Sequence, residues 1–402
     1  MQFTDDPIPS VQGLAALARL VYEGGDAPGL GAALAARLDA DASDAGAMMD
    51  LACLVQLAGQ RENGLQLQAG ALELSRAYVT RHGDGSGLRV LALMVPGDMM
   101  ANTPLDFLLV GSDAQLCCLY LDADGTLPAR IPDHDVAVLA VGESAENARI
   151  LRSLQPMIRC WPRPMLNANP DQIARLTRDG VSALFVDEPS ILCPPTRRMG
   201  RAALADTSAE LDYPLIVRPV GSHAGVALER IADAGEMYRY LASRPEAELY
   251  VSPFVDYRSP DGLYRKQRIV FIDGAPFVAH MAISDHWMVH YLSAGMHERA
   301  ERRAEEADFM AGFDTGFRRR HAPALSALND RLQLDYFGID CAETPDGRLL
   351  LFEADVAMIV HDLDDEATFP YKKPAMRRLF AALQDLLAKT AATPGLAVGS
   401  AA

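Results

Sequence analysis

Three carboxylates lie close together in predicted β-structure near the C-terminal end of the chain. Asp340 lies in "FGIDCAET", and Glu353 and Asp355 lie two residues apart in "GRLLLFEADV". Residues two apart on a strand face the same side, and the turn at 345–348 predicts a hairpin that pairs the two strands. Buried like charges are costly unless they are compensated, and Mg²⁺ takes such oxygen ligands. The pattern predicts a magnesium site formed by Asp340, Glu353 and Asp355, with a solvated edge strand as the alternative.

An arginine and a loop of small side chains follow another predicted strand. The run "PLIVRP" delivers Arg218 and leads directly into "GSHAGV" at 221–226. Backbone N–H groups of such a loop can converge on an anion, most often a phosphate, and Arg218 would lie beside the same anion. An ordinary glycine-rich turn between strands is the alternative. The candidate loop residues are Gly221, Ser222, His223, Ala224, Gly225 and Val226.

Basic residues open the strand "YRKQRIVFIDG". Arg268 shares a strand face with Lys266, so two cations could meet phosphate or carboxylate oxygens. The dipeptide Asp273-Gly274 then separates two apolar runs, which predicts a hairpin. A solvated basic strand start is the alternative interpretation of the cations.

Histidines are concentrated just after that hairpin. His280, His286 and His290 lie in "AHMAISDHWMVHY", and His361 follows the carboxylate hairpin. We interpret this group as part of an acceptor-substrate pocket, with His290 as the base for an incoming amine. A histidine metal site and purely structural histidines are the alternatives.

The elements that must position these residues begin with a helical segment. Leucines recur at helical spacing from the N-terminus, and residues 1–82 are predicted to form a helical domain. Segments 47–60 and 63–79 predict two helices around a short turn, a pair that resembles one tetratricopeptide unit. An ordinary helical domain is the alternative, because one such unit cannot bury its faces alone. The glycine-rich stretch 81–87 predicts a linker.

Continuous apolar runs follow the linker. They lie at 88–95, 116–121 and 136–141, with an amphipathic helix predicted at 144–155. Strands buried on both faces are typical of a parallel sheet, so residues 88–165 are predicted to form a small α/β domain. The domain lacks a GxGxxG fingerprint and is therefore not assigned to dinucleotide binding.

The remainder of the chain, residues 166–390, mixes strands and helices. A helix is predicted over 170–185 and another over 374–390, with the strands described above between them. The fold class predicted for the whole chain is α/β (α+β). The small-residue segment 391–402 is predicted to be a disordered tail.

Composition excludes several functional classes. The chain has 402 residues and a net charge of -17, which argues against general nucleic-acid binding and against an anionic membrane surface. Its six cysteines form no CxxC pair, so neither a zinc site nor a disulfide framework is predicted. The acidic N-terminus lacks a signal-peptide pattern, and we expect a cytoplasmic protein.

The ordered set of motifs resembles the ATP-grasp superfamily over roughly residues 88 to 385. The likeness is nearest the branch of glutathione synthetases and ribosomal-protein glutamate ligases. The motifs are, in order, "ILCPPT", "PLIVRPVGSHAGV", "LYVSPFV", "KQRIVFIDG" and "GIDCAE" followed by "GRLLLFEAD". The resemblance implies an ATP-grasp fold with a small α/β pre-domain, here preceded by an all-helical N-terminal domain.

The same resemblance implies roles for individual residues. Arg178 and Arg218 would contact the phosphates of ATP, and the loop at 221–226 would close over them. Asp340, Glu353 and Asp355 would hold one or two Mg²⁺ ions, and Arg268 would steady the transferred phosphate. The adenine and ribose would be lined by Tyr250, Val251, Phe254 and Asp256.

This chain departs from the family pattern at three points. Both family cations are usually lysine, and here they are arginine, which keeps the charge but not the shape. Asp355 stands where asparagine is usual, and Pro253 stands in the hinge where an acidic residue is common. These changes leave ATP binding in place and put turnover in question.

The activity that the resemblance implies is an ATP-dependent carboxylate–amine ligase that works through an acyl-phosphate. ATP and Mg²⁺ are the implied cofactors, and the partners are small-molecule or peptide carboxylate and amine substrates. A non-catalytic nucleotide-binding scaffold and an ATP-grasp phosphotransferase are the alternatives. The helical N-terminal domain suggests a peptide or protein partner, and a homodimer is left open.

Overall fold

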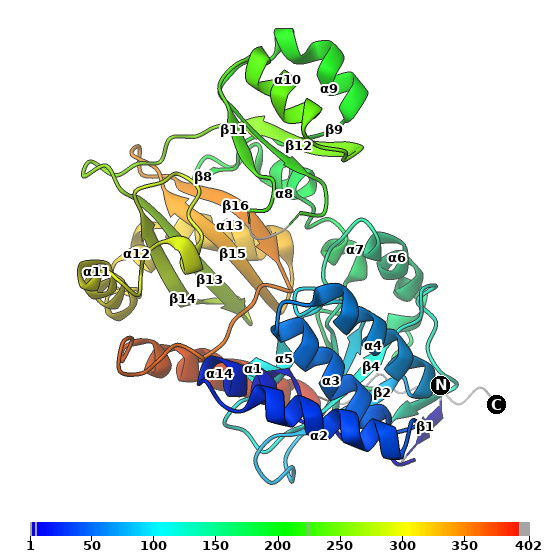
Figure 1. The fold of residues 1–402 in the computed structure, drawn as a ribbon. Coiled ribbons are helices and arrows are strands. Elements are labelled where there is room, and N and C mark those ends of the chain that lie inside the picture. The colour runs from blue at the N-terminus through cyan, green and yellow to red at the C-terminus, as the bar shows by residue number, and fades with distance from the viewer. Residues whose placement is uncertain (1, 5, 223–224, 394–402) are drawn as a thin grey trace, which may run out of the picture.

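The computed structural model describes residues 2–4, 6–222 and 225–393, and its fold is mixed α/β, as the sequence predicts. Three larger β-sheets and the helices that cover them make up the molecule (Figure 1). A separate pair of short parallel strands joins β1 (Gln2–Thr4) to β5 (Arg130–Pro132). Within the described residues, no helix is both long and apolar enough to cross a membrane.

Four helices form most of the N-terminal segment. They are α1 (Leu14–Tyr22), α2 (Ala27–Ala40), α3 (Ala45–Leu57) and α4 (Arg61–Leu74). The side chains of Asp26 and Asp44 cap α2 and α3 by accepting hydrogen bonds from Gly29 N and Ala47 N. Helices α3 and α4 pack against each other around the predicted short turn.

The predicted helix over 63–79 is wrong in its last part. Helix α4 ends at Leu74, and Ser75 is already extended, with φ -150° and ψ 141°. Residues Ala77–Arg81 form strand β2, which pairs antiparallel with β4. The burial of Tyr78 against that sheet outweighs the helical periodicity of the segment. The range 1–82 thus contains four helices together with strands β1 and β2.

The first sheet has the strand order β2-β4-β3-β6-β7. Its other strands are β3 (Arg89–Met94), β4 (Gln115–Tyr120), β6 (Val136–Leu139) and β7 (Met165–Leu166). Strands β4, β3, β6 and β7 run parallel, and three of them occupy the predicted apolar runs. Two helices belong to this region, α5 (Leu105–Leu108) and α6 (Asn147–Ile158).

The single helix predicted over 170–185 is also wrong, because the chain forms two helices there. They are α7 (Pro170–Ile173) and α8 (Arg178–Phe185). Thr177 starts the second helix, and its hydroxyl accepts a hydrogen bond from Gly180 N at 3.0 Å. This cap stabilises a new helix start and places Arg178 in the first turn of α8.

The second sheet forms the upper lobe in Figure 1. Its antiparallel strands, in the order β11-β10-β12-β9, are β9 (Arg197–Gly200), β10 (Leu215–Pro219), β11 (Glu229–Ile231) and β12 (Glu248–Pro253). Helices α9 (Arg201–Thr207) and α10 (Ala234–Ala242), with a 3-10 turn at Ser208–Glu210, cover one face. The lobe has its own apolar core, which includes Leu204, Val217 and Met237.

The third sheet carries both predicted hairpins, which are confirmed. Its order is β14-β13-β15-β16-β8, with β8 (Ile191–Leu192), β13 (Tyr264–Ile272), β14 (Ala275–Ser284), β15 (Tyr336–Glu343) and β16 (Leu349–Asp355). Asp273 and Gly274 both have positive φ and join β13 to β14. The remaining helical elements are a 3-10 turn (Tyr291–Ser293), α11 (Ala300–Ala311), α12 (Phe317–Arg320), α13 (Ala322–Leu332) and α14 (Lys372–Ala391).

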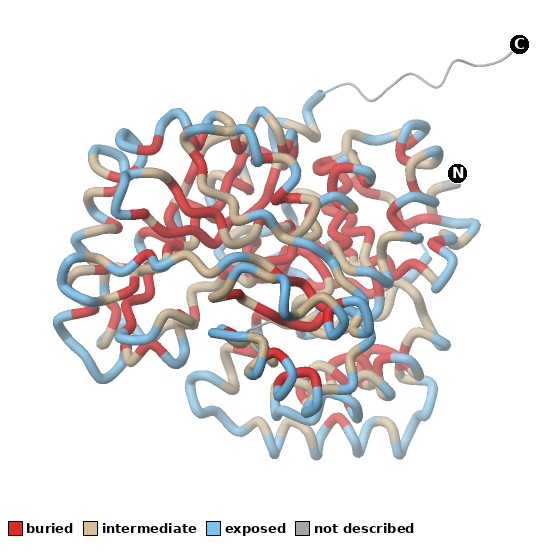
Figure 2. The backbone as a smooth tube through the Cα atoms, turned by 90° about the horizontal axis from the view of Figure 1, so that it is seen from above, coloured by how far each residue is buried: buried red, intermediate tan, exposed pale blue. Residues whose placement is uncertain are grey.

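One large core joins the first and third sheets. It includes Leu91 of β3, Phe271 of β13 and Leu379 of α14. Figure 2 shows the buried segments concentrated in the interior, with exposed residues along the outer loops and helices. Because α14 contacts β14, β6 and α5, it ties the C-terminal end of the chain to the first sheet. The predicted tail at 391–402 lies, from residue 394 onward, outside the described residues.

Candidate functional site

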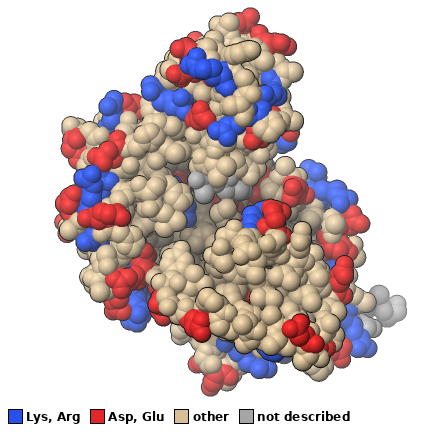
Figure 3. Space-filling model, viewed as in Figure 1, with Lys and Arg blue, Asp and Glu red and all other residues tan. Residues whose placement is uncertain are grey.

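A cavity of about 640 Å³ lies between the upper lobe, the third sheet and the N-terminal helices. Figure 3 shows the surface hollowed below the upper lobe. Strands β10, β12, β13, β15 and β16, helix α8 and the loop after β14 all contribute side chains to its wall. Of the predicted site residues, the cavity brings together Arg178, Arg218, Gly225, Tyr250, Phe254, Arg268, His290, Asp340, Glu353 and Asp355.

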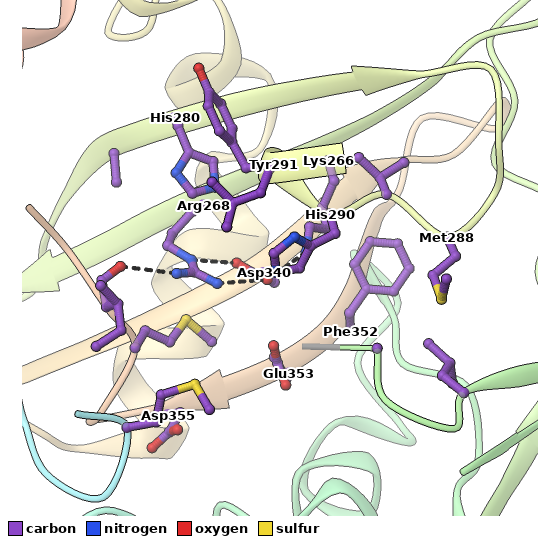
Figure 4. Close-up of a pocket in the computed structure, with 18 of the residues that line it drawn as sticks. Lys266, Arg268, His280, Met288, His290, Tyr291, Asp340, Phe352, Glu353 and Asp355 are labelled. Carbon is purple, nitrogen blue, oxygen red and sulfur yellow. Dashed lines mark hydrogen bonds and ion pairs between the residues drawn. The ribbon is translucent and has the colours of Figure 1, made fainter. Parts of the chain in front are cut away.

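An ion cluster around Asp340 occupies the centre of this wall (Figure 4). Arg268 lies opposite Asp340 in the β13–β15 ladder, and its Nε donates to Oδ1 at 2.8 Å while Nη2 donates to Oδ2 at 3.0 Å. Lys266 Nζ donates to Oδ2 at 2.8 Å. Burial alone would raise the pKa of Asp340, but the charges of Arg268 and Lys266 hold that pKa well below its usual value. The cluster carries two positive charges and one negative charge.

A second ionic contact lies beside the first. Arg178 of α8 pairs with Glu353, which lies opposite Asp340 in the β15–β16 ladder. Burial would raise the pKa of Glu353, but the charge of Arg178 leaves that pKa below its ordinary value. Asp355 lies two residues further along β16 and accepts a hydrogen bond from Ala357 N at 3.0 Å. Burial and the nearby charge of Glu353 raise the pKa of Asp355 to about 6.

Arg218 is a buried cation of the site, with a relative exposure of 7%. Its guanidinium donates to Ser222, through Nε to the hydroxyl at 3.0 Å and through Nη2 to the carbonyl oxygen. Burial and the nearby positive charge of Arg178 lower the pKa of Arg218 to about 10. Within the described residues, Arg218 has no carboxylate partner within salt-bridge distance. An anion placed beside it would relieve this burial cost.

The carboxylates do not form a ready-made metal cage. Among the residues that the structure describes, no group of three or more His, Cys, Asp or Glu side chains lies close enough to hold a metal ion. Both oxygens of Asp340 are occupied by Lys266 and Arg268. Glu353 and Asp355 are each engaged through one oxygen, by Arg178 and by Ala357 N, and Mg²⁺ commonly binds through one or two carboxylates plus substrate phosphates and water. The donor set therefore fits Mg²⁺ at Glu353 and Asp355 more closely than at Asp340.

Glu143 is a site residue that sequence reasoning missed. It follows β6 and lines a small cavity beside the main one, together with Arg178, Glu353 and Asp355. Burial and the charge of Asp355 raise the pKa of Glu143 to about 7. The sequence signal that could have found Glu143 was its position just after the predicted strand at 136–141. Ligands of open α/β sheets bind beyond the carboxyl ends of parallel strands.

The glycine loop contributes to the site at its two ends. Gly221 and Ser222 line the small cavity beside Arg178, whereas Gly225 lines the main cavity. Val226 lines neither of these cavities and is 65% exposed. His223 and Ala224, which were also predicted to contact phosphate, lie outside the described residues.

The predicted adenine wall is formed only in part. Tyr250 and Phe254 line the cavity, and the ring of Phe254 meets Trp287 edge-on, with centroids 5.7 Å apart. Val251 does not line it, because strand alternation turns this side chain into the core of the upper lobe. Asp256 does not line it either, because its carboxylate pairs with Arg258 at 2.6 Å.

Three of the four singled-out histidines line the main cavity. They are His280, His290 and His361, whereas His286 lies outside it, with its Nδ1 accepting from Met288 N. Burial and the charges of Lys266 and Arg268 lower the pKa of His290, so its ring is neutral near pH 7. The alternative of a histidine metal site has no three-ligand group in the described part of the chain.

The chain matches no family model and no curated protein. Among solved structures it is similar to an ATP-grasp RimK domain protein from Sphaerobacter thermophilus, at 15% identity and a TM-score of 0.43 over 74% of this chain and 99% of that one. It is also similar to a D-alanine–D-alanine ligase from Bacillus anthracis complexed with ATP, at 14% identity and a TM-score of 0.46 over 76% and 97%.

A third similar structure is the VanG D-Ala:D-Ser ligase from Enterococcus faecalis. Identity is 13% and the TM-score 0.47, over 75% of this chain and 100% of that one. All three likenesses are distant, so the function is argued below from the side chains of the cavity.

Proposed function

We propose that this chain is an ATP-dependent carboxylate–amine ligase of the ATP-grasp type. One observation carries the proposal: two arginines from different elements and two carboxylates of β16 converge in one cavity. Arg178 comes from α8 and Arg218 from β10, and both line the same cavity as Glu353 and Asp355. Phosphate groups and Mg²⁺ together match this arrangement of opposite charges.

Each part of the proposed nucleotide site has a chemical counterpart on the cavity wall. The base would lie against the apolar surface that Tyr250, Phe254 and Trp287 provide. Arg178 and Arg218 would bind the phosphate oxygens, and the N–H groups of the loop after β10 would complete the anion site. Glu353 and Asp355 would hold Mg²⁺, which when bound neutralises the charge that develops on transferred phosphate.

The proposed reaction has two steps. In the first, a carboxylate oxygen of the substrate attacks the γ-phosphorus of ATP, the bond to the bridging oxygen breaks, and ADP leaves. In the second, an amine nitrogen attacks the acyl carbon of the acyl-phosphate, and inorganic phosphate leaves with the bonding pair. Arg268 and Lys266 would orient the reacting oxygens, since their cluster keeps a net positive charge. Neutral His290 would accept the proton of the amine.

The test is ATP binding by calorimetry with and without Mg²⁺. We would compare the wild type with the Glu353→Gln/Asp355→Asn double variant. Asp346→Asn serves as the matched control, because Asp346 lies on the turn between the same two strands and pairs only with its local neighbours. We expect Mg²⁺-dependent binding that the double variant loses and the control keeps.

ADP release with added acids and amines then separates a ligase from the alternatives. Amide formation together with ADP supports the proposal. Binding without turnover under every acid and amine would instead indicate a nucleotide-binding scaffold, and a phosphorylated product without a new amide would indicate a phosphotransferase. Absence of ATP binding in every condition would refute the proposed site.

A further inference from the structure

The cavity continues beyond the ionic cluster into an apolar end. Its wall there is formed by Ala18 and Tyr22 of α1, Leu57 of α3, Phe107 of α5 and the methionines at 99–100. Ala18 and Phe107 belong to one small apolar cluster with Leu363. The N-terminal helices therefore form part of the cavity wall as well as a separate layer of the fold. Figure 3 shows few charged side chains on the surface over these helices.

One loop joins the ionic cluster to this apolar end. After β16, the carbonyl oxygen of Ile359 accepts a hydrogen bond from Arg268 at 2.9 Å. Two residues later, the ring of His361 lies between Phe107 and Tyr22, with centroid distances of 5.9 and 6.1 Å. Two residues of extended chain span at most about 7 Å, so the apolar end begins within the length of a small molecule from Arg268.

A salt bridge holds that loop against the first helix. Asp362 pairs with Arg19 of α1 at 2.5 Å, and the Asp362 side chain is only 7% exposed. His361 itself is neutral near pH 7, because burial lowers its pKa, and its Nδ1 accepts from Leu363 N. The loop is thus anchored to α1 beside the apolar wall.

The charges of the cavity indicate which end of a substrate lies where. Lys266 and Arg268 share the single carboxylate of Asp340, which leaves a net positive charge next to the loop. Two other acidic groups lie nearby and are already paired, Glu353 with Arg178 and Asp364 with Lys372 at 3.2 Å. An anionic group is favoured at the cluster, and an apolar group is favoured at Tyr22, Leu57 and Phe107.

We infer that the substrate activated by this protein is a carboxylic acid with an apolar tail, whose tail lies against the N-terminal helices. This inference rests on the proposed function and narrows it to a substrate class. The carboxylate lies at Arg268 and Lys266, where its oxygen can attack the γ-phosphorus. The tail lies along the loop at 359–363 and is enclosed by Tyr22, Leu57 and Phe107.

The test uses hexanoate, 3-phenylpropanoate and adipate as probes, with hydroxylamine as a general amine. An acyl-phosphate formed from any of them reacts with hydroxylamine to give a hydroxamate and phosphate, so the natural amine is not needed. Hexanoate and adipate have the same number of carbons, and only adipate would place a charge in the apolar end. We expect kcat/KM for the two apolar acids to exceed that for adipate by at least about tenfold.

Binding is measured separately by calorimetry of each acid on protein saturated with Mg²⁺ and ATP. Two variants place a charge in the apolar end, Tyr22→Asp and Leu57→Asp. The control is Leu74→Asp: like Tyr22, Leu74 is the last residue of its helix and exposed, but it does not line the cavity. We expect both cavity variants to weaken hexanoate binding by at least about tenfold, with ATP binding and the Leu74 variant unchanged.

The outcomes separate this inference from the proposed function. Equal or better use of adipate, or equal effects of the cavity and control variants, would overturn the apolar-tail assignment. If ATP binds and none of the acids does, the substrate class is wrong and the nucleotide site stands. If ATP itself does not bind, the proposed function fails first. Thermal unfolding of each variant shows whether a loss of binding reflects a loss of fold.

Discussion

Replacing Asp340 with alanine should destabilise the protein strongly, because two half-buried cations would lose their buried partner. The Asp340 side chain is 2% exposed, and those of Lys266 and Arg268 are 16% and 18% exposed. Three charge-assisted hydrogen bonds end on this carboxylate. Removal of one member of a buried ionic group costs about 3–5 kcal/mol, so we expect a loss of that size in the free energy of unfolding.

Urea denaturation at pH 7 measures this loss. Asp346→Ala is the control, since Asp346 also pairs with an arginine, Arg348, but on an exposed turn between the same strands. We expect no comparable change there, because solvent screens such a pair. A triple variant with Asp340→Ala, Lys266→Met and Arg268→Met should recover much of the stability, because it removes the unpaired charges as well.

The effect of Asp340→Ala should also depend on pH. The folded-state pKa of Asp340 lies well below its unfolded value of about 3.9, so its stabilising contribution is complete above about pH 5. It is lost as the pH falls toward the folded-state pKa. We therefore expect a constant difference between wild type and variant from pH 8 to 5, and a smaller one below about pH 4.

Two results would refute this reasoning. One is a loss smaller than about 1 kcal/mol at pH 7 with an unchanged dependence on urea, which would mean that water or another group satisfies both cations. The other is a difference that grows as the pH falls below 4, since protonation of Asp340 must weaken its ion pairs.

Three further predictions follow from individual contacts. Thr177→Ala removes the cap of α8, and we expect a loss of about 1 kcal/mol in urea denaturation and weaker ATP binding by calorimetry, because Arg178 is in the first turn of that helix. Gly225→Ala should cost about 1–2 kcal/mol, since φ is +75° there and a Cβ would lie 3.2 Å from Met288 Sδ. Burial raises the folded-state pKa of Glu306, so denaturation should show the wild type gaining stability relative to Glu306→Gln as the pH falls from neutral toward the unfolded pKa of about 4.3.

Each of these three has a matched comparison. Thr177→Ser keeps a capping hydroxyl and should behave as the wild type, and equal losses for the serine and alanine variants would contradict the capping argument. Gly262 also has a positive φ, +85°, but faces open space, so Gly262→Ala separates backbone strain from the contact with Met288. Glu305→Gln, at the neighbouring exposed position, should show no pH-dependent gain of the Glu306 kind.

Local patterns in the sequence predicted most of the strands and both hairpins. The run before Asp273-Gly274 and the run after it became β13 and β14, and the turn at 345–348 placed Asp340 opposite Glu353. Strands and hairpins depend on residues that are near one another in the chain: on the alternation of apolar and polar side chains, and on turn residues such as Asp-Gly. The pairing of carboxylates across β15 and β16 was therefore accessible without a structure.

Local patterns failed where burial against distant elements, or a competing local contact, decided the outcome. The segment after Leu74 has helical periodicity, yet it is a strand because Tyr78 pairs in the first sheet with a strand some 40 residues further on. The predicted helix over 170–185 divides because Thr177 caps a new helix. Here the capping signal outweighs the helical periodicity of the segment. Val251 and Asp256 were assigned to the adenine wall by resemblance, and strand alternation and a local ion pair turn them away from it.

The sequence by itself determined the strands, the hairpins and the presence of cations and carboxylates with the chemistry of phosphate and metal binding. Only the tertiary structure decided which of these groups neutralise one another. Asp340 belongs to Lys266 and Arg268 because β13 and β15, far apart in the chain, are neighbours in the sheet. Glu143 and the N-terminal helices likewise reach the cavity only because the fold brings together segments that are far apart in the chain. Interaction energies between charges and apolar surfaces depend on distance in space, which the order of residues does not specify.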